Sequence, residues 1–194
     1  MVAILSPDAV SKVRMTADEY FQAELPEGYR YELVEGVVEI SPPPGTQHDD
    51  GLERLAELLF DYRKAHPGSI AKIGLKAGVV IPGKETVREP DLCVYRHWPK
   101  NARGFEVWKE RTPLVVIEAV SVGQARRDSE DKREDYLQAG VEEYWILDPH
   151  KECVRVLARE GSQWRETVFT EADTYRPAAL PEFELPVRLV LKDK

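Results

Sequence analysis

The spacing of apolar and capping residues along the chain predicts three helices, over 16–24, 48–65 and 128–139. In the second, apolar side chains recur every three or four positions, which gives one buried stripe. Thr16 and Glu19 have the capping-box spacing that begins the first. Asp128 is the expected N-cap of the third and Gly140 its expected C-cap.

Runs rich in β-branched and aromatic residues predict the strands. These lie at 30–40, 70–81, 91–95, 113–121, 141–149, 153–160 and 164–170. The first has Glu35-Gly36 in its middle, so it is either a hairpin or one strand bent at Gly36. The run 113–121 is nearly all apolar, which is typical of a strand buried on both faces. Three consecutive prolines make 41–48 a loop, and most of the tail is expected to be irregular.

This order of elements predicts a mixed α/β (α+β) fold, with a central mixed β-sheet flanked by helices. A length of 194 residues suits one domain. Because no linker rich in Gly or Ser interrupts the chain, we expect one domain over 1–194. Residues 1–14 are expected to form a flexible N-terminal arm.

Composition narrows the class of protein. Lys and Arg number 27 against 35 Asp and Glu, for a net charge of −8. This balance argues against a protein that coats nucleic acid, but allows a local basic patch or a site where acids hold a metal ion. Cys93 and Cys153 are too few for a disulfide framework or a zinc site, which favours a reduced cytoplasmic protein. We see no signal peptide and no apolar stretch of the roughly 20 residues needed to span a membrane.

Acidic residues beside the apolar strands carry the clearest chemistry. Glu118 lies inside the apolar run 113–121, where a lone carboxylate is costly unless it is paired or holds a metal ion. Asp91 follows a proline at the start of another strand, and Lys132 lies in the next predicted helix. Two carboxylates on neighbouring strands with a lysine nearby can support metal-assisted phosphodiester hydrolysis, because Mg²⁺ prefers oxygen ligands and activates bound water.

Several motifs together resemble one family. They are E-P-D at 89–91, V-V-I-E at 115–118, D-x-x-x-K-x-x-x-Y at 128–136, A-G-V-E-E-Y-W-I-L-D-P at 139–149 and, upstream, Y-E-L-V-E-G-V-V at 31–38 followed by S-P-P and His48. The chain is similar over roughly 15–190 to the Uma-type restriction endonucleases of the PD-(D/E)XK nuclease superfamily. The run at 139–149 is the most specific part of this resemblance.

The resemblance implies a restriction-endonuclease-like fold and a four-residue catalytic site. Asp91 matches the PD aspartate, Glu118 the acidic residue of the (D/E)XK element, and Glu32 an N-terminal glutamate. Val120 stands where the parent motif has its lysine, so the lysine role moves to Lys132 on the following helix. Asp91, Glu118 and the Ala119 backbone carbonyl are then the expected ligands of Mg²⁺, with Mn²⁺ as the alternative ion.

Some of these residues also have structural interpretations. Lys132 lies in a highly charged segment and could belong to a solvated helix face, and Glu32 could be a surface strand residue. His48 is in phase with the apolar stripe of its helix, so it is either an accessory group for phosphate or metal, or a structural histidine.

The connection 96–112 is the best candidate for a DNA-contacting surface. It has five basic against two acidic residues, a local balance of +3, with three aromatic residues among them. Such groups can hold phosphates and stack on bases, although the aromatic side chains could instead pack the segment onto the domain. The expected DNA contacts are Arg96, Lys100, Arg103, Lys109 and Arg111.

Our primary hypothesis is a Mg²⁺-dependent endonuclease that hydrolyses DNA. Cutting both strands of a duplex would favour a homodimer. The alternative is a catalytically inactive nucleic-acid-binding or structural protein on a nuclease scaffold. A nuclease for RNA or branched DNA is a third option that the sequence does not separate from the first.

Overall fold

The computed structural model of the chain describes residues 13–41, 46–75, 77–98, 111–120 and 127–191, with side chains omitted at 46–49 and 127–130. The helices are α2 (Ala17–Gln22), α3 (Thr46–Ala65), α5 (Arg127–Ala139) and α6 (Arg188–Leu191). The strands are β1 (Arg30–Val34), β2 (Val37–Ser41), β3 (Lys72–Leu75), β4 (Val79–Val80), β5 (Val87–Arg88), β6 (Leu92–Tyr95), β7 (Val115–Ala119), β8 (Glu143–Asp148), β9 (Cys153–Glu160), β10 (Gln163–Thr170), β11 (Thr174–Tyr175) and β12 (Leu185–Pro186).

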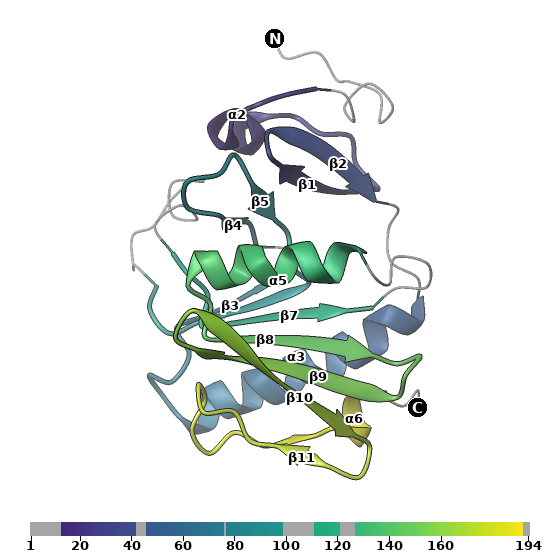
Figure 1. Cartoon of the computed structure of the whole chain (residues 1–194). Coiled ribbons are helices and arrows are strands. Elements are labelled where there is room, and N and C mark those ends of the chain that lie inside the picture. The colour runs from purple at the N-terminus through teal and green to yellow at the C-terminus, as the bar shows by residue number, and fades with distance from the viewer. Residues whose placement is uncertain (1–12, 42–45, 76, 99–110, 121–126, 192–194) are drawn as a thin grey trace.

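A six-stranded mixed sheet forms the centre of the fold. Its strand order is β10-β9-β8-β7-β6-β3. The β7–β8 pair is parallel, as expected for two strands joined through helix α5, and the other pairs are antiparallel. Figure 1 shows α5 crossing in front of this sheet and α3 behind it. The predicted α+β architecture, a mixed sheet flanked by helices, is confirmed.

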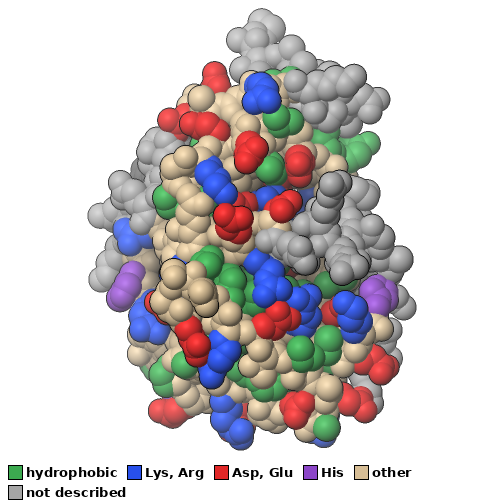
Figure 2. All heavy atoms as spheres, in the orientation of Figure 1, with side chains coloured by type: hydrophobic (Ala, Val, Ile, Leu, Met, Phe, Trp, Pro, Cys, Tyr) green, Lys and Arg blue, Asp and Glu red, His purple; other side chains and the backbone are tan. Residues whose placement is uncertain are grey.

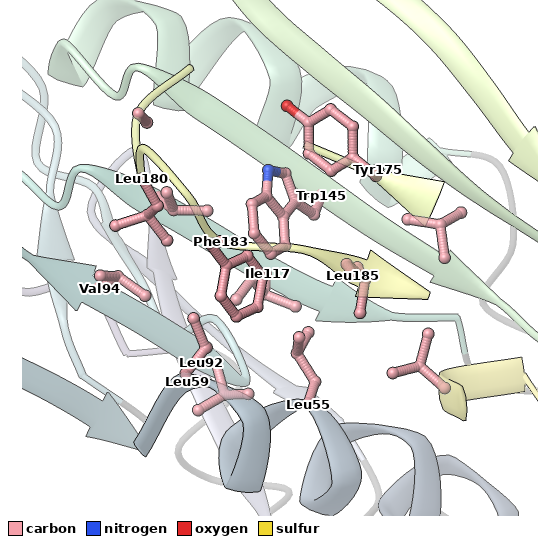
Figure 3. Close-up of a cluster of buried hydrophobic side chains, with 14 of the residues drawn as sticks. Leu55, Leu59, Leu92, Val94, Ile117, Trp145, Tyr175, Leu180, Phe183 and Leu185 are labelled. Carbon is pink, nitrogen blue, oxygen red and sulfur yellow. The ribbon is translucent and has the colours of Figure 1, made fainter. Parts of the chain in front are cut away.

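Side chains of the central strands point alternately to the two faces of the sheet and form two separate hydrophobic cores. One set of side chains packs against α3 and the C-terminal segment, where Leu59, Ile117, Trp145 and Phe183 meet (Figure 3). The neighbouring residues on the same strands point to the opposite face and pack against α5 through Tyr136. Because successive strand residues point to opposite faces, the apolar residues of the run around β7 fill both cores.

A smaller antiparallel sheet, with strand order β2-β1-β5-β4, lies beside the α5 face (Figure 1). β1 and β2 form the predicted hairpin, whose turn places Glu35 at φ 49° and Gly36 at φ 78°. Glycine suits this turn because positive φ is costly for residues with a Cβ. Thr16 and Glu19 form the predicted capping box of α2. Tyr20 of this helix packs into the hydrophobic core of the smaller sheet.

The structure differs from the predicted elements mainly where strands are short. The single strand predicted over 70–81 is two strands in different sheets, β3 and β4. Between them a Cβ on Gly78 would lie 2.9 Å from the Phe21 ring, so the chain changes sheets through a close approach that only glycine permits. β5 was not predicted, because its two residues are too few to show a periodic pattern.

Helix boundaries also differ from the prediction. α3 begins at Thr46, within the predicted loop, and α5 begins at Arg127, so Asp128 is inside the helix instead of capping it.

The N-terminal arm was predicted to cover residues 1–14. Arg14, its last residue, forms a β-bridge with Val37 of β2 and is therefore already paired with the domain. Residues 1–12 lie outside the described part of the chain. None of the helices described is long and apolar enough to cross a membrane.

Candidate active site

Asp91 and Glu118 come together on neighbouring antiparallel strands. Leu92 of β6 pairs with Ile117 of β7, and continuing this register by one residue places Asp91 opposite Glu118. The Asp91 Oδ2 atom accepts a hydrogen bond from the Ala119 backbone N–H at 2.9 Å. Two carboxylates in this relation repel one another, so the site requires positive charge nearby.

Helix α5 supplies two donors to Glu118. Lys132 Nζ lies 2.8 Å from Glu118 Oε2, and the Tyr136 hydroxyl donates to Glu118 Oε1 at 2.5 Å. Lys132 and Tyr136 are four residues apart, so they lie on the same helix face. Only 11% of the Lys132 side chain is exposed, which excludes its alternative interpretation as part of a solvated face.

Glu32 of β1 joins the same cluster from the smaller sheet. Its Oε1 lies 3.0 Å from Lys132 Nζ, and its Oε2 accepts from Arg88 Nη1 at 3.0 Å. The Glu89 backbone N–H also donates to Oε1 at 3.1 Å. Glu32 is therefore a mostly buried partner of Lys132 and not a surface strand residue. The four predicted catalytic side chains belong to one cluster where the two sheets and α5 meet.

A second layer of charges, which the sequence did not reveal, supports this cluster. Arg88 of β5 donates from Nε to Asp135 Oδ2 at 2.9 Å while its Nη1 holds Glu32. Asp135 also accepts from Lys84 Nζ at 2.9 Å. Arg88 and Asp135 are both buried, and the placement of Asp135 three residues after Lys132 on α5 was the available signal.

Arg30, at the start of β1, is the other residue that sequence reasoning missed. Its Nη1 lies 2.7 Å from Asp91 Oδ1, and its Nη2 donates to the Glu89 carbonyl at 2.9 Å. Because alternate residues of a strand share a face, Arg30 and Glu32 project from β1 toward the same site. That two-residue spacing was the signal that could have found Arg30.

The charges of the cluster shift the pKa values of its members. Burial raises the pKa of the Glu118 carboxyl, and Lys132 only partly offsets this effect because Glu32 and Asp91 add to it. For Glu32, burial also acts to raise the pKa, but the positive charges of Lys132 and Arg88 outweigh it and lower the pKa. Burial opposes the charge of Lys132, yet Glu118 and Glu32 raise its pKa above the ordinary value. Lys132 therefore stays an ammonium group.

The donor set suits a magnesium ion. Mg²⁺ is commonly held by one or two carboxylates together with several waters, and Asp91 and Glu118 supply two carboxylates on adjacent strands. Among the described residues, no group of three or more His, Cys, Asp or Glu could form a metal cage, as a structural zinc site would need. The Ala119 carbonyl, on the residue whose N–H binds Asp91, remains the predicted third ligand.

Of the other predicted site residues, the structure places Arg96 away from this cluster. Arg96 lies beyond the opposite end of β6 from Asp91, roughly 16 Å along the strand, and donates to the Ala179 carbonyl at 2.8 Å. Arg111 is half-buried. Lys100, Arg103 and Lys109 lie outside the described residues, as does the side chain of His48, whose backbone belongs to the first turn of α3.

Trp98 is the one aromatic residue of the predicted DNA-contacting segment that lies within the described ranges. It packs edge-on against Tyr95 with ring centroids 5.0 Å apart, and Lys72 Nζ lies 5.3 Å from its ring centroid. These contacts support a packing role for Trp98.

Comparisons with known proteins agree with the resemblance seen in the sequence. The family model Uma2, described as "Putative restriction endonuclease", matches residues 17–188. A solved structure from Anabaena variabilis ATCC 29413, described as "a putative nuclease belonging to DUF820", superposes with a TM-score of 0.75. It is 20% identical, and the match covers 91% of this chain and 97% of that one, which shows a shared fold. The comparison with curated proteins gave no significant match. Because the family model matches most of its length, the chain belongs to the Uma2 family of putative restriction endonucleases.

Proposed function

We propose that the protein is a Mg²⁺-dependent endonuclease that hydrolyses phosphodiester bonds of DNA. The observation that carries this proposal is the pairing of Asp91 with Glu118 across two strands, with Lys132 bound to Glu118 at 2.8 Å. Membership of the Uma2 family supports a nuclease activity, and the donor set supports the choice of ion.

Each residue of the cluster has a distinct role in this proposal. Asp91, Glu118 and the Ala119 carbonyl would hold the ion. The chemistry that a bound Mg²⁺ would supply is a water of lowered pKa and neutralisation of charge on the phosphate. Lys132 orients the attacking water and stabilises the negative charge that develops as the water attacks phosphorus, with no covalent enzyme intermediate. Glu32 keeps Lys132 in position.

Tyr136 fixes the orientation of the Glu118 carboxylate. Burial, followed by the charges of Glu118 and Glu32, raises the pKa of the Tyr136 phenol well above its ordinary value. The hydroxyl therefore keeps its proton and remains a donor. With Tyr136 on Oε1 and Lys132 on Oε2, both Glu118 oxygens have fixed directions, and each retains lone pairs that can face an ion.

DNA is the proposed substrate, and a homodimer in the cytoplasm is the proposed working form. In Figure 2, acidic and basic side chains are interspersed on the described part of the face that α5 occupies, without a broad basic surface. Together with the net charge of −8, this distribution predicts weak binding to DNA outside the site, with an affinity that falls as salt rises. The basic segment 96–112 remains the proposed additional contact.

Nicking of supercoiled plasmid in Mg²⁺, in Mn²⁺ and in EDTA tests the proposed function. We expect the wild type to nick in either ion and to be inactive in EDTA. Glu118→Gln is expected to lose activity by a factor of at least about 100, because it removes a metal-binding charge. Glu57→Gln on α3, a residue exposed at 55%, is the matched control and should retain activity. Equal nicking by the wild type and Glu118→Gln would exclude this assignment.

The balance of charges in the cluster favours a second candidate, a catalytically inactive nucleic-acid-binding or structural protein. Four acidic and four basic side chains form the cluster and its second layer: Glu32, Asp91, Glu118, Asp135, Arg30, Lys84, Arg88 and Lys132. Such a network can be stable without an ion. Calorimetry separates the candidates, because the inactive protein would bind no divalent ion and the nuclease would bind one through Asp91.

A further inference from the structure

Arg30 lies on the carboxylate that the proposed function assigns to the metal ion. Its Nη1 is 2.7 Å from Asp91 Oδ1, and 18% of its side chain is exposed. The other Asp91 oxygen, Oδ2, accepts the Ala119 backbone N–H at 2.9 Å. The guanidinium and the Ala119 N–H thus contact different oxygens of Asp91.

The other terminal nitrogen of the Arg30 guanidinium binds the backbone just before Asp91. Nη2 donates to the Glu89 carbonyl at 2.9 Å, so the guanidinium clamps the two ends of the segment Glu89-Pro90-Asp91. The negative charges that act on Arg30 are those of Asp91, Glu118 and Glu32. Arg30 therefore supplies positive charge close to where the carboxylates converge.

A divalent cation and a guanidinium cannot both occupy this position without strong repulsion. Asp91 Oδ1 lies 2.7 Å from the positively charged Arg30 guanidinium. Even with the dielectric constant of bulk water, a unit positive charge about 5 Å from a divalent ion weakens the binding of that ion by more than about tenfold. The effect is larger where the site is partly dehydrated.

We propose that Arg30 is the resident counter-ion of the metal site and competes with the divalent ion for Asp91 Oδ1. This inference rests on the proposed function, because it concerns the ion that this function requires. In the absence of the ion, Arg30 neutralises Asp91 and keeps the segment before β6 in place. When the ion binds, the guanidinium leaves Oδ1, so Arg30 sets the ion concentration at which the site fills.

Calorimetric titration with Ca²⁺ alone, without DNA, tests the competition. Arg30→Met removes the charge but keeps much of the side-chain bulk, and we expect it to bind Ca²⁺ at least about tenfold more tightly than the wild type. Arg54→Met on α3, where Arg54 pairs with Glu57, is the matched control and should bind like the wild type. Equal or weaker Ca²⁺ binding by Arg30→Met, with normal binding by the wild type, would overturn the inference and leave the proposed function intact. If neither protein binds Ca²⁺, both the inference and the proposed metal dependence are wrong.

A measurement on the wild type covers the case in which Arg30→Met does not fold. The NMR signal of the Arg30 Nε–H group, assigned by comparison with Arg30→Lys, is followed while Ca²⁺ is added. We expect the signal to shift in a saturable way, with the midpoint of the calorimetric titration, because the guanidinium leaves Asp91. Saturable Ca²⁺ binding with an unchanged Arg30 signal would overturn the inference.

Discussion

Lys132→Met is expected to destabilise the protein because two carboxylates share the Lys132 ammonium group. Its Nζ lies 2.8 Å from Glu118 Oε2 and 3.0 Å from Glu32 Oε1 in a mostly buried site. Methionine keeps the apolar stem of the side chain but carries no charge. The substitution therefore leaves Glu118 without its ion-pair partner, while Glu32 keeps Arg88. Breaking a buried ion pair in this way costs about 3–5 kcal/mol.

Proton uptake limits this cost and makes it depend on pH. A glutamate with an ordinary pKa of about 4.3 can be protonated at a cost of about 1.36 kcal/mol for each pH unit above that value. The limit is about 3.7 kcal/mol at pH 7 and about 1 kcal/mol at pH 5. For Lys132→Met we therefore expect a loss of about 3 kcal/mol in the free energy of unfolding at pH 7, and of about 1 kcal/mol or less at pH 5, where Glu118 takes up a proton.

Urea unfolding at the two pH values measures this difference. The matched control is Lys64→Met, because Lys64 pairs with Asp61 at 3.0 Å on α3 but both side chains are highly exposed. Exposed pairs contribute little, so this variant should show little change at either pH. A loss for Lys132→Met that is the same at pH 5 and pH 7, or that is below about 1 kcal/mol at pH 7, would refute the buried sharing of the ammonium group.

Three further substitutions test other parts of the structure. Arg88→Met should lower the free energy of unfolding, measured by urea denaturation, by about 3 kcal/mol, because buried Asp135 and Glu32 each lose an ion-pair partner. A loss below about 1 kcal/mol would argue against the second layer of charges. The lowered pKa of Glu32 means that its stabilising contribution is complete above its unfolded pKa and is lost as the pH falls through the folded value. Glu32→Gln should therefore flatten the acid limb of a melting-temperature profile, and an unchanged limb would contradict the shift. Leu59→Ala, at a fully buried position beneath the sheet, should cost about 2–5 kcal/mol, and a thermal midpoint like that of the wild type would place Leu59 outside the core.

The sequence was informative about the site where strand alternation and helix spacing act over short distances. An acid in the apolar run of β7 must meet a compensating group, and Glu118 does so through Lys132 and Tyr136. The sequence alone could place Lys132 and Tyr136 on the same face of a helix, because they are four residues apart. Asp91 and Glu118 become neighbours through the register of two strands that were both predicted.

The charged residues that complete the site come from contacts across long stretches of chain. Arg30 and Asp91 are far apart in sequence, and Arg88 reaches Asp135 from a strand too short to be recognised. The local spacing only places Arg30 on the strand face of Glu32 and Asp135 near the helix face of Lys132; it does not show which residues they contact. Only the placement of the smaller sheet beside α5 brings them together, and that placement depends on the change of sheet at Gly78.

The position of bound Mn²⁺ in crystals of the protein tests the central claim, that Asp91 and Glu118 hold a divalent ion, most directly. Diffraction data collected near the manganese absorption edge would locate the ion by its anomalous signal. We predict a peak within about 2.5 Å of carboxylate oxygens of both Asp91 and Glu118, with Arg30 moved away from Asp91 Oδ1. An anomalous peak at other residues alone, or none at this site at saturating Mn²⁺, would contradict the account.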